Sequence, residues 1–233
     1  MAALTPMMQQ YMQTKKEYPD CILFYRLGDF YEMFFDDALT ASKVLEITLT
    51  GRDCGQPERA PMCGVPYHAC DVYLNKLIEN GFKVAICEQV EDPKLAKGIV
   101  KREVIRVVTP GTNMSNAILD ETRNNYLMSI FENDGAFGIS LVDITTGEFK
   151  TARVPSLSKL TDEINKYSPA EIIGNHSFMN CDLDFVYLRE KMKISISEAP
   201  EHYFNQMLCE DAIMRQFGVN NMDGLGLKDF PDC

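Results

Sequence analysis

The pattern of apolar residues along this chain changes at the stretch "TPGT", residues 109–112. Before it, apolar runs typical of buried strands alternate with stretches whose apolar residues recur every three to four positions, as in amphipathic helices. After it, three strand-like runs follow one another directly and meet at glycine-containing turns, which is typical of an antiparallel meander. The sequence therefore predicts an α/β (α+β) protein of two domains, residues 1–112 and 113–233.

The first half is expected to form a mixed α/β domain. An apolar run predicts a strand over Cys21–Arg26, and helical spacing predicts a helix from Phe30 to about Leu45. The segment from Thr48 to Ala69, rich in Gly, Pro, Arg and Cys, is predicted to be a long exposed loop, and such loops are usually functional or disordered. Further helices are expected near residues 6–18 and 71–80, and further strands over residues 82–90 and 99–108.

The second half is expected to begin with the three antiparallel strands. The helix "SLSKLTDEINKY", the short strand "AEIIGN", a short helix at residues 185–191, the strand "KISISEA" and the long helix "EHYFNQMLCEDAIMRQFGV" follow. Three antiparallel strands and then alternating helices and strands is the order of a ribonuclease-H-like sheet. We therefore expect a ribonuclease-H-like second domain.

Composition places the chain among soluble globular proteins, with 45% hydrophobic and 24% charged residues. No apolar run approaches the ~18 residues needed to span a bilayer. The start "MAALTPMMQQYMQTKK" lacks the charged-then-apolar order of a signal peptide. We expect a cytoplasmic protein with no membrane partner.

The net charge of −11 is unevenly distributed. Residues 1–112 hold 13 Lys and Arg against 15 Asp and Glu, a balance of −2, whereas residues 113–233 hold 10 against 19, a balance of −9. The first half can therefore present a local basic face, while the second half should repel phosphate. Basic residues that would add phosphate contacts are Lys94, Lys97, Lys101 and Arg102.

The eight cysteines are scattered and never spaced C-x-x-C, so we expect reduced and mostly buried thiols. The tightest cluster offers four candidate zinc ligands, Cys54, Cys63, His68 and Cys70. Their spacing matches no zinc finger or ribbon, and we expect no metal in this chain.

The stretch "GDFYEMF" (Gly28–Phe34) contains a possible capping box at the start of the expected helix. Asp29 would be the N-cap, and Glu32, three residues later, would complete the box. This arrangement leaves Phe30 unexplained, because a large ring at the first helical position tends to project from the domain. A projecting ring exposes apolar surface and indicates a binding partner.

Five stretches resemble the MutS family of DNA mismatch-recognition proteins: "TPMMQQYMQTKKEYPDCILFYRLGDFYEMFFDDA", "ITLTGR", "PMCGVPYHA", "VAICEQVEDP" and "VTPGT". The resemblance is collinear and covers the whole chain, weakening in its second half. It implies that residues 1–112 are a mismatch-binding domain and that residues 113–233 are a connector domain, C-terminally truncated in an N-terminal fragment.

The resemblance implies that Phe30 and Glu32 enter the minor groove at the mispair. A Phe wedge forfeits base stacking and regains part of it against the displaced base, so it selects sites that are already easily deformed. We expect Glu32 to discriminate against perfect duplex more than it adds affinity. Arg52, Met62 and Tyr67 are implied to contact the DNA, and the alternative for Met62 and Tyr67 is that they fold their loop onto the domain.

The resemblance also bears on partners and cofactors. The sequence contains no G-x-x-x-x-G-K-[ST] loop, so we expect no enzyme activity and no ATP or Mg²⁺ site in this chain. In the parent protein those ligands would belong to the ATPase domain. We expect a monomeric fragment that binds mispaired duplex weakly, and a dimeric, nucleoid-associated parent whose connector helps to receive MutL.

Two other functions remain open at this point. A ribonuclease-H-like sheet invites a two-metal nuclease, for which Asp143 and Glu148 are candidate ligands. Asp143 precedes "ITTG", a simple hairpin turn in which an aspartate is common, and a fold alone does not confer chemistry. The second half would otherwise be a purely structural connector.

Overall fold

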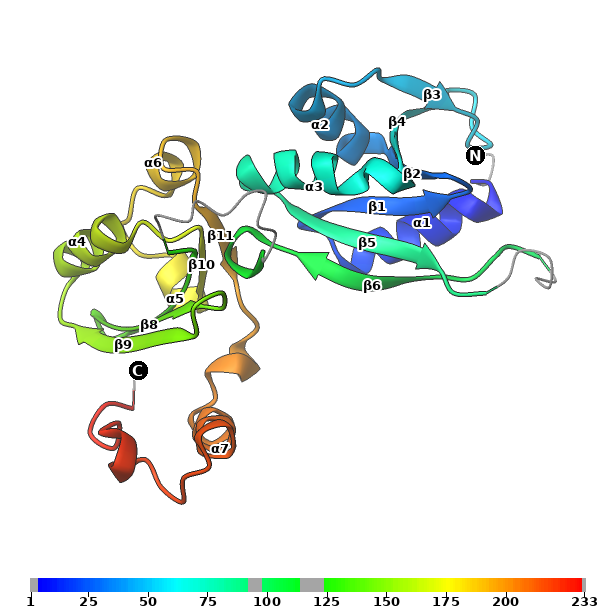
Figure 1. Cartoon of the computed structure of the whole chain (residues 1–233). Coiled ribbons are helices and arrows are strands. Elements are labelled where there is room, and N and C mark those ends of the chain that lie inside the picture. Colours follow the sequence, from blue (N-terminus) through cyan, green and yellow to red (C-terminus); the bar gives the residue numbers. More distant parts are fainter. Residues whose placement is uncertain (1–3, 92–97, 114–123, 232–233) are drawn as a thin grey trace. The chain divides into compact units, whose positions relative to one another are not determined.

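The computed structural model describes residues 4–91, 98–113 and 124–231 (Figure 1). The chain divides into two compact units, residues 1–118 and 119–233. The segment that joins them, residues 114–123, lies outside the described residues, so the expected boundary at 112/113 stays a prediction.

The first unit is built on a six-stranded mixed sheet of order β3-β4-β2-β1-β5-β6. Its strands are β1 (Cys21–Leu27), β2 (Phe30–Phe34), β3 (Thr50–Arg52), β4 (Ala60–Pro66), β5 (Lys83–Gln89) and β6 (Arg102–Val108). β1 and β5 are parallel, and the other neighbours are antiparallel. The strands expected near residues 21–26, 82–90 and 99–108 are confirmed.

Helices cover both faces of this sheet, α1 (Pro6–Glu17) on one and α2 (Phe35–Leu45) with α3 (Cys70–Glu79) on the other (Figure 1). Successive strand side chains alternate between the faces. In β1, Phe24 packs with α2 and α3, whereas Leu23 and Tyr25 pack with Tyr11 of α1. The sheet is therefore buried on both sides.

The expected helix from Phe30 is wrong over its first turn. Residues 30–34 form β2, with Tyr31 and Met33 buried in one core and Phe34 in the other, and the helix begins at Phe35. Asp29 is therefore no N-cap, and the capping box with Glu32 does not exist. β2 leads directly into α2 and carries apolar residues on both faces, so its sequence matched a helical spacing as well as a strand.

The expected long loop from Thr48 to Ala69 is also wrong. It contains β3 and β4, and β4 lies inside the sheet between β2 and β3. Cys63 and Val65 of β4 are fully buried. Glycine and proline concealed this strand, because they are depleted in strands and mark loops in most sequences.

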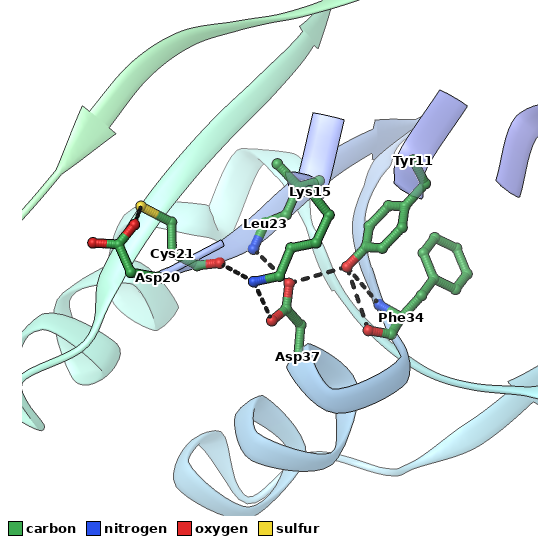
Figure 2. A network of polar contacts seen from close by, with 7 residues as sticks. All are labelled: Tyr11, Lys15, Asp20, Cys21, Leu23, Phe34 and Asp37. Carbon is green, nitrogen blue, oxygen red and sulfur yellow. Dashed lines mark hydrogen bonds and ion pairs between the residues drawn. The ribbon is translucent and has the colours of Figure 1, made fainter. Parts of the chain in front are cut away.

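A buried polar network joins α1, β1 and α2 around Asp37 (Figure 2). The Asp37 carboxylate, in a residue 6% exposed, accepts hydrogen bonds from the Tyr11 hydroxyl (3.0 Å) and the Leu23 amide (3.0 Å). It also pairs with Lys15 (2.9 Å), whose ammonium group donates to the Cys21 carbonyl (2.5 Å). Each buried polar atom of this network thus has a hydrogen-bond partner from another element.

The second unit contains a five-stranded sheet of order β11-β10-β7-β8-β9. A meander of β7 (Tyr126–Asn133), β8 (Ala136–Asp143) and β9 (Glu148–Val154) is followed by β10 (Glu171–Gly174) and β11 (Ser195–Glu198). β10 is parallel to β7 and to β11. This is the predicted ribonuclease-H-like order.

One core holds the second unit together. Met128, Ile130 and Ile139 of the sheet pack with α4 (Leu157–Tyr167), α5 (His176–Met179) and α6 (Phe185–Glu190). The helix expected over residues 201–219 is instead a 3₁₀ turn, η3 (Glu201–Phe204), followed by α7 (Gln206–Phe217). In both units, the described residues contain no helix that is long and apolar enough to cross a bilayer.

Candidate nucleic-acid interface

The hairpin between β1 and β2 carries the exposed ring predicted from the sequence. Leu27 pairs with Phe30, which leaves Gly28 and Asp29 as a two-residue turn. Gly28 has φ +58°, a conformation that favours glycine, and the first central position of a type II′ hairpin turn requires it. Phe30 is 46% exposed just after this turn. The ring therefore projects from a strand end rather than from a helix.

Glu32 lies on the same face of β2 as Phe30, two residues along the strand. Its side chain is 15% exposed and forms an ion pair with Arg52 of β3. β4 lies between these two strands, and there Glu32 pairs with Gly64. A Cβ at Gly64 would already touch Glu32 Cγ at 3.4 Å, so a larger side chain there would crowd the carboxylate where it crosses β4. The structure thus brings Glu32 and Arg52 together.

Met62 is placed differently from the exposed ring. It pairs with Phe34 of β2 and Thr50 of β3, and it packs partly buried against the core beneath α1. This position favours the structural alternative for Met62, although its predicted DNA contact stays a prediction.

Tyr67 begins the 3₁₀ turn η1 (Tyr67–Ala69) and is 44% exposed. Its amide donates to the Asp29 carbonyl (2.9 Å). The Arg26 guanidinium carbon lies 3.8 Å from the centroid of its ring. Tyr67 therefore lies directly beside the turn that presents Phe30.

Sequence reasoning missed a cluster beneath this turn. Arg26 forms an ion pair with Glu88 (3.7 Å), and Glu88 also accepts a hydrogen bond from the Tyr31 hydroxyl. Burial and then the hydrogen bond to Glu88 raise the pKa of Tyr31, so its hydroxyl stays protonated at neutral pH. The available signal was the position of Arg26 and Tyr31 on either side of a two-residue turn, where they become cross-strand partners.

The candidate phosphate contacts are partly engaged within the protein. Arg102 donates to the Arg26 carbonyl (2.7 Å) and to Gln10, and Lys101 pairs with Glu103 (2.5 Å). Lys94 and Lys97 lie outside the described residues.

The described cysteines are free thiols, and Cys21, Cys54, Cys63 and Cys87 are buried, as expected. Burial raises the pKa of Cys63 to about 12, so its thiol is protonated and unreactive. Cys63 and Cys54 belong to the cores on opposite faces of the sheet, which separates two of the candidate zinc ligands. Across residues 4–91, 98–113 and 124–231, no three His, Cys, Asp or Glu side chains are grouped to hold a metal.

Asp143 is part of its own hairpin. It is fully buried and accepts hydrogen bonds from the Thr145 amide (2.9 Å), the Thr145 hydroxyl (2.6 Å) and the Asn125 amide (3.0 Å). A carboxylate occupied in this way organises a turn. The geometry therefore gives no support to the nuclease alternative.

Comparison with known proteins agrees with this architecture. Two family models match the chain, "MutS domain I" over residues 5–117 and "MutS domain II" over residues 125–233. The chain is similar to proteins named "DNA mismatch repair protein MutS" from Lachnoclostridium phytofermentans (61% identity, 99% of the chain, 25% of the relative) and Acetivibrio thermocellus (57%, 93% and 25%). A protein of the same name from Clostridioides difficile is 51% identical over 100% of the chain and 22% of its own length.

The fold and these similarities define the class by two successive units, one of the MutS domain I kind and one of the MutS domain II kind. The chain belongs to the MutS family. It spans about a quarter of the length of the relatives that it matches.

Proposed function

We propose that this chain recognises mispaired and unpaired bases in duplex DNA by inserting Phe30 into the minor groove, with Glu32 beside it. The observation that carries the proposal is the 46% exposed Phe30 ring at the β1–β2 hairpin of a MutS domain I. An apolar ring held at the end of a strand fits between base steps, and apolar wedges are a common minor-groove device.

Selectivity follows from the cost of insertion. Separating a stacked base step costs a few kcal/mol, and the wedge recovers part of this by stacking on a displaced base. A mispair has already lost much of that stacking and pairing energy. One ring can therefore recognise many mispairs through deformability, without reading base edges.

Glu32 contributes discrimination in this proposal. A carboxylate near phosphates is repelled unless it meets a base-edge donor or an opposite charge. Arg52 supplies that opposite charge within the free protein, since it pairs with Glu32. Glu32 thus approaches DNA as a partly neutralised pair, and its net contribution depends on whether the local base pair offers a donor.

Fluorescence anisotropy with a G·T duplex and its matched control tests the proposal. At low salt, of order 50 mM, the chain should prefer the mispaired duplex several-fold, and Phe30→Ala should remove the preference. Phe149→Ala is the matched control, because Phe149 is also a strand residue and is 48% exposed, but in the second unit. Equal binding of both duplexes by the unmodified chain would refute the proposal.

The same assay tests the role of Glu32 separately. Glu32→Gln should bind matched duplex more tightly than the unmodified chain does and so reduce the ratio of the two affinities. An equal loss of affinity for both duplexes would show instead that Glu32 only supports the fold or general binding.

For the second unit we propose a spacer that also receives MutL. Its balance of −9 charges disfavours DNA, and α6 exposes Val186 and Tyr187, which are 64% and 49% exposed. Capture of MutL by immobilised chain, lost in a Val186→Asp/Tyr187→Asp variant, is the expected result. Undiminished capture by that variant would place the contact elsewhere, and absence of capture by the unmodified chain would contradict the MutL proposal.

A further inference from the structure

The hairpin turn that presents Phe30 is held by side chains with no part in the proposed wedge. Both carbonyl groups of the turn are occupied. The Gly28 carbonyl accepts from Arg26 Nε (2.6 Å), and the Asp29 carbonyl accepts from the Tyr67 amide (2.9 Å). A two-residue turn with both carbonyls engaged has little freedom to change its shape.

Arg26 joins these contacts into one cluster. Its guanidinium carbon lies 3.8 Å from the centroid of the Tyr67 ring and 5.6 Å from that of Tyr31, and its Nη1 lies 3.7 Å from Glu88. Glu88 is also the acceptor for the Tyr31 hydroxyl. We call these four residues, Arg26, Tyr31, Tyr67 and Glu88, the turn clamp.

The turn clamp draws on four separate elements, β1, β2, η1 and β5. Arg26 and Tyr31 are cross-strand partners, and Tyr31 belongs to the core beneath α2 and α3. Phe30 and Glu32 alternate with Tyr31 along β2, so their side chains point to the opposite face of the sheet. The clamp therefore holds the turn from the face away from the wedge.

We propose that Arg26 is a positioning residue for mispair recognition, which holds the β1–β2 turn so that Phe30 is presented in a single orientation. The inference rests on the proposed function of Phe30. In this proposal Tyr67 supports the turn, because its ring packs against the Arg26 guanidinium group. An ordered wedge loses less conformational freedom on insertion, so ordering raises affinity at the site where the ring inserts.

The chemistry requires arginine at this position. The guanidinium group donates from Nε to the turn while its plane stacks on tyrosine and its Nη1 faces a carboxylate. Lysine carries the same charge but has neither the planar face nor a donor at that position. Arg26→Lys therefore removes the clamp and keeps the electrostatic attraction to phosphate.

Two measurements on the Arg26→Lys chain test the proposal. Hydrogen exchange of the Tyr67 amide should become about tenfold faster, because its bond to Asp29 opens more often. The preference for G·T over matched duplex should fall at least about threefold, with matched-duplex affinity and its dependence on salt unchanged. Arg106→Lys, an exposed arginine of β6, is the control and should change neither quantity.

A second variant, Glu88→Gln, weakens the clamp without touching Arg26 and should shift both quantities in the same direction by less. Circular dichroism checks that each variant is folded. Unchanged Tyr67 exchange in both variants would overturn the inference. So would an equal loss of affinity for both duplexes with a weaker salt dependence, which is the mark of a phosphate contact.

The proposed function of Phe30 and the positioning role of Arg26 can be refuted by different outcomes. If the unmodified chain shows no mispair preference, or if Phe30→Ala keeps it, the wedge itself is refuted and the inference falls with it. If the wedge stands and Arg26→Lys keeps the full preference, the positioning role of Arg26 alone is wrong.

Discussion

Asp37 and its neighbour Asp36 show how strongly position along a helix decides the role of a residue. Both lie in the first turn of α2, but Asp36 faces solvent and Asp37 is buried among Tyr11, Lys15 and Leu23 (Figure 2). If a neutral group replaces this buried carboxylate, the donors that surround it face a weaker hydrogen-bond acceptor, which destabilises the fold. We therefore expect the stability of the first unit to depend on Asp37 and not on Asp36.

Asp37→Asn should lower the free energy of unfolding of the first unit by about 3 kcal/mol, since it breaks a buried ion pair and removes an acceptor. Asp36→Asn, the matched control, should change it by less than about 0.5 kcal/mol. Hydrogen exchange with mass spectrometry at increasing urea concentrations measures this for the unit alone. Equal effects of the two substitutions would show that the network contributes nothing specific.

Asp143 gives a prediction about pH. Burial raises the pKa of Asp143, but hydrogen bonds from Thr145, Asn125 and Thr146 outweigh it and leave the pKa below its usual value. Because the folded pKa is the lower one, the carboxylate stabilises the fold above the unfolded pKa of about 3.9, and this contribution is lost as pH falls through the folded pKa.

Asp143→Asn should therefore destabilise the second unit by about 1–3 kcal/mol at pH 7, and the difference from the unmodified chain should shrink below about pH 4. Urea unfolding at a series of pH values measures it. Asp162→Asn, on the exposed side of α4, is the control. A difference that stays constant down to pH 3 would contradict the assignment of Asp143 as a charged turn residue.

At the scale of elements, most strands and helices were predictable from their apolar pattern, whereas β2 and β4 were not. The meander and α4 appeared where alternation or helical spacing predicted them. β2 did not, because its apolar residues continue directly into those of α2 and so fitted a helical spacing, and β4 did not, because glycine and proline hid it. The exposed ring of Phe30 was predictable even though its element was wrong, since Gly28, two positions before the ring, marks a turn in either case.

The turn clamp shows which contacts of the candidate site could not be predicted from the sequence. Arg26 and Tyr31 become partners only once Gly28 and Asp29 form a hairpin. Glu88 joins them because β5 lies parallel to β1, which is a long-range pairing. Local pattern contains no information on such pairings, and so Glu32–Arg52 and Arg26–Glu88 could be found only in the folded structure.

The contact between α5 and β10 leads to a prediction for one element. A Cβ at Gly174 would overlap the fully buried Phe178 ring and lie 2.9 Å from its Cγ. Gly174→Ala should destabilise the second unit by about 3 kcal/mol, the cost of an overpacked core. Gly224→Ala, where a Cβ meets open space, is the control, and Phe178→Leu should partly rescue Gly174→Ala. If Phe178→Leu gave no rescue, the destabilisation by Gly174→Ala would come from the backbone at residue 174 and not from overlap with the Phe178 ring.

At the scale of the whole molecule, the chain contains two units with separate cores and different charge. The first unit has a core on each face of its sheet, and the second has a single core. Their charge balances are −2 over residues 1–112 and −9 over residues 113–233, so the second unit should repel phosphate more strongly than the first. We therefore expect the units to be independent in stability as well as in function.

Hydrogen exchange at increasing urea should show two unfolding transitions. Asp37→Asn should move the transition of peptides from the first unit, and Gly174→Ala that of peptides from the second, each leaving the other in place within about 0.5 kcal/mol. A single transition moved by both substitutions would mean that the two units unfold cooperatively.

The exposure of Phe30 also has a spectroscopic consequence. The chain contains no tryptophan. Phe30→Trp would thus carry a single indole at the tip of the β1–β2 hairpin, excitable at wavelengths that the tyrosines do not absorb. Its emission would report solvent polarity at one chosen point, and stacking on a nucleobase would quench it. In the proposed function this ring enters the duplex, so the same position would report the rate of insertion.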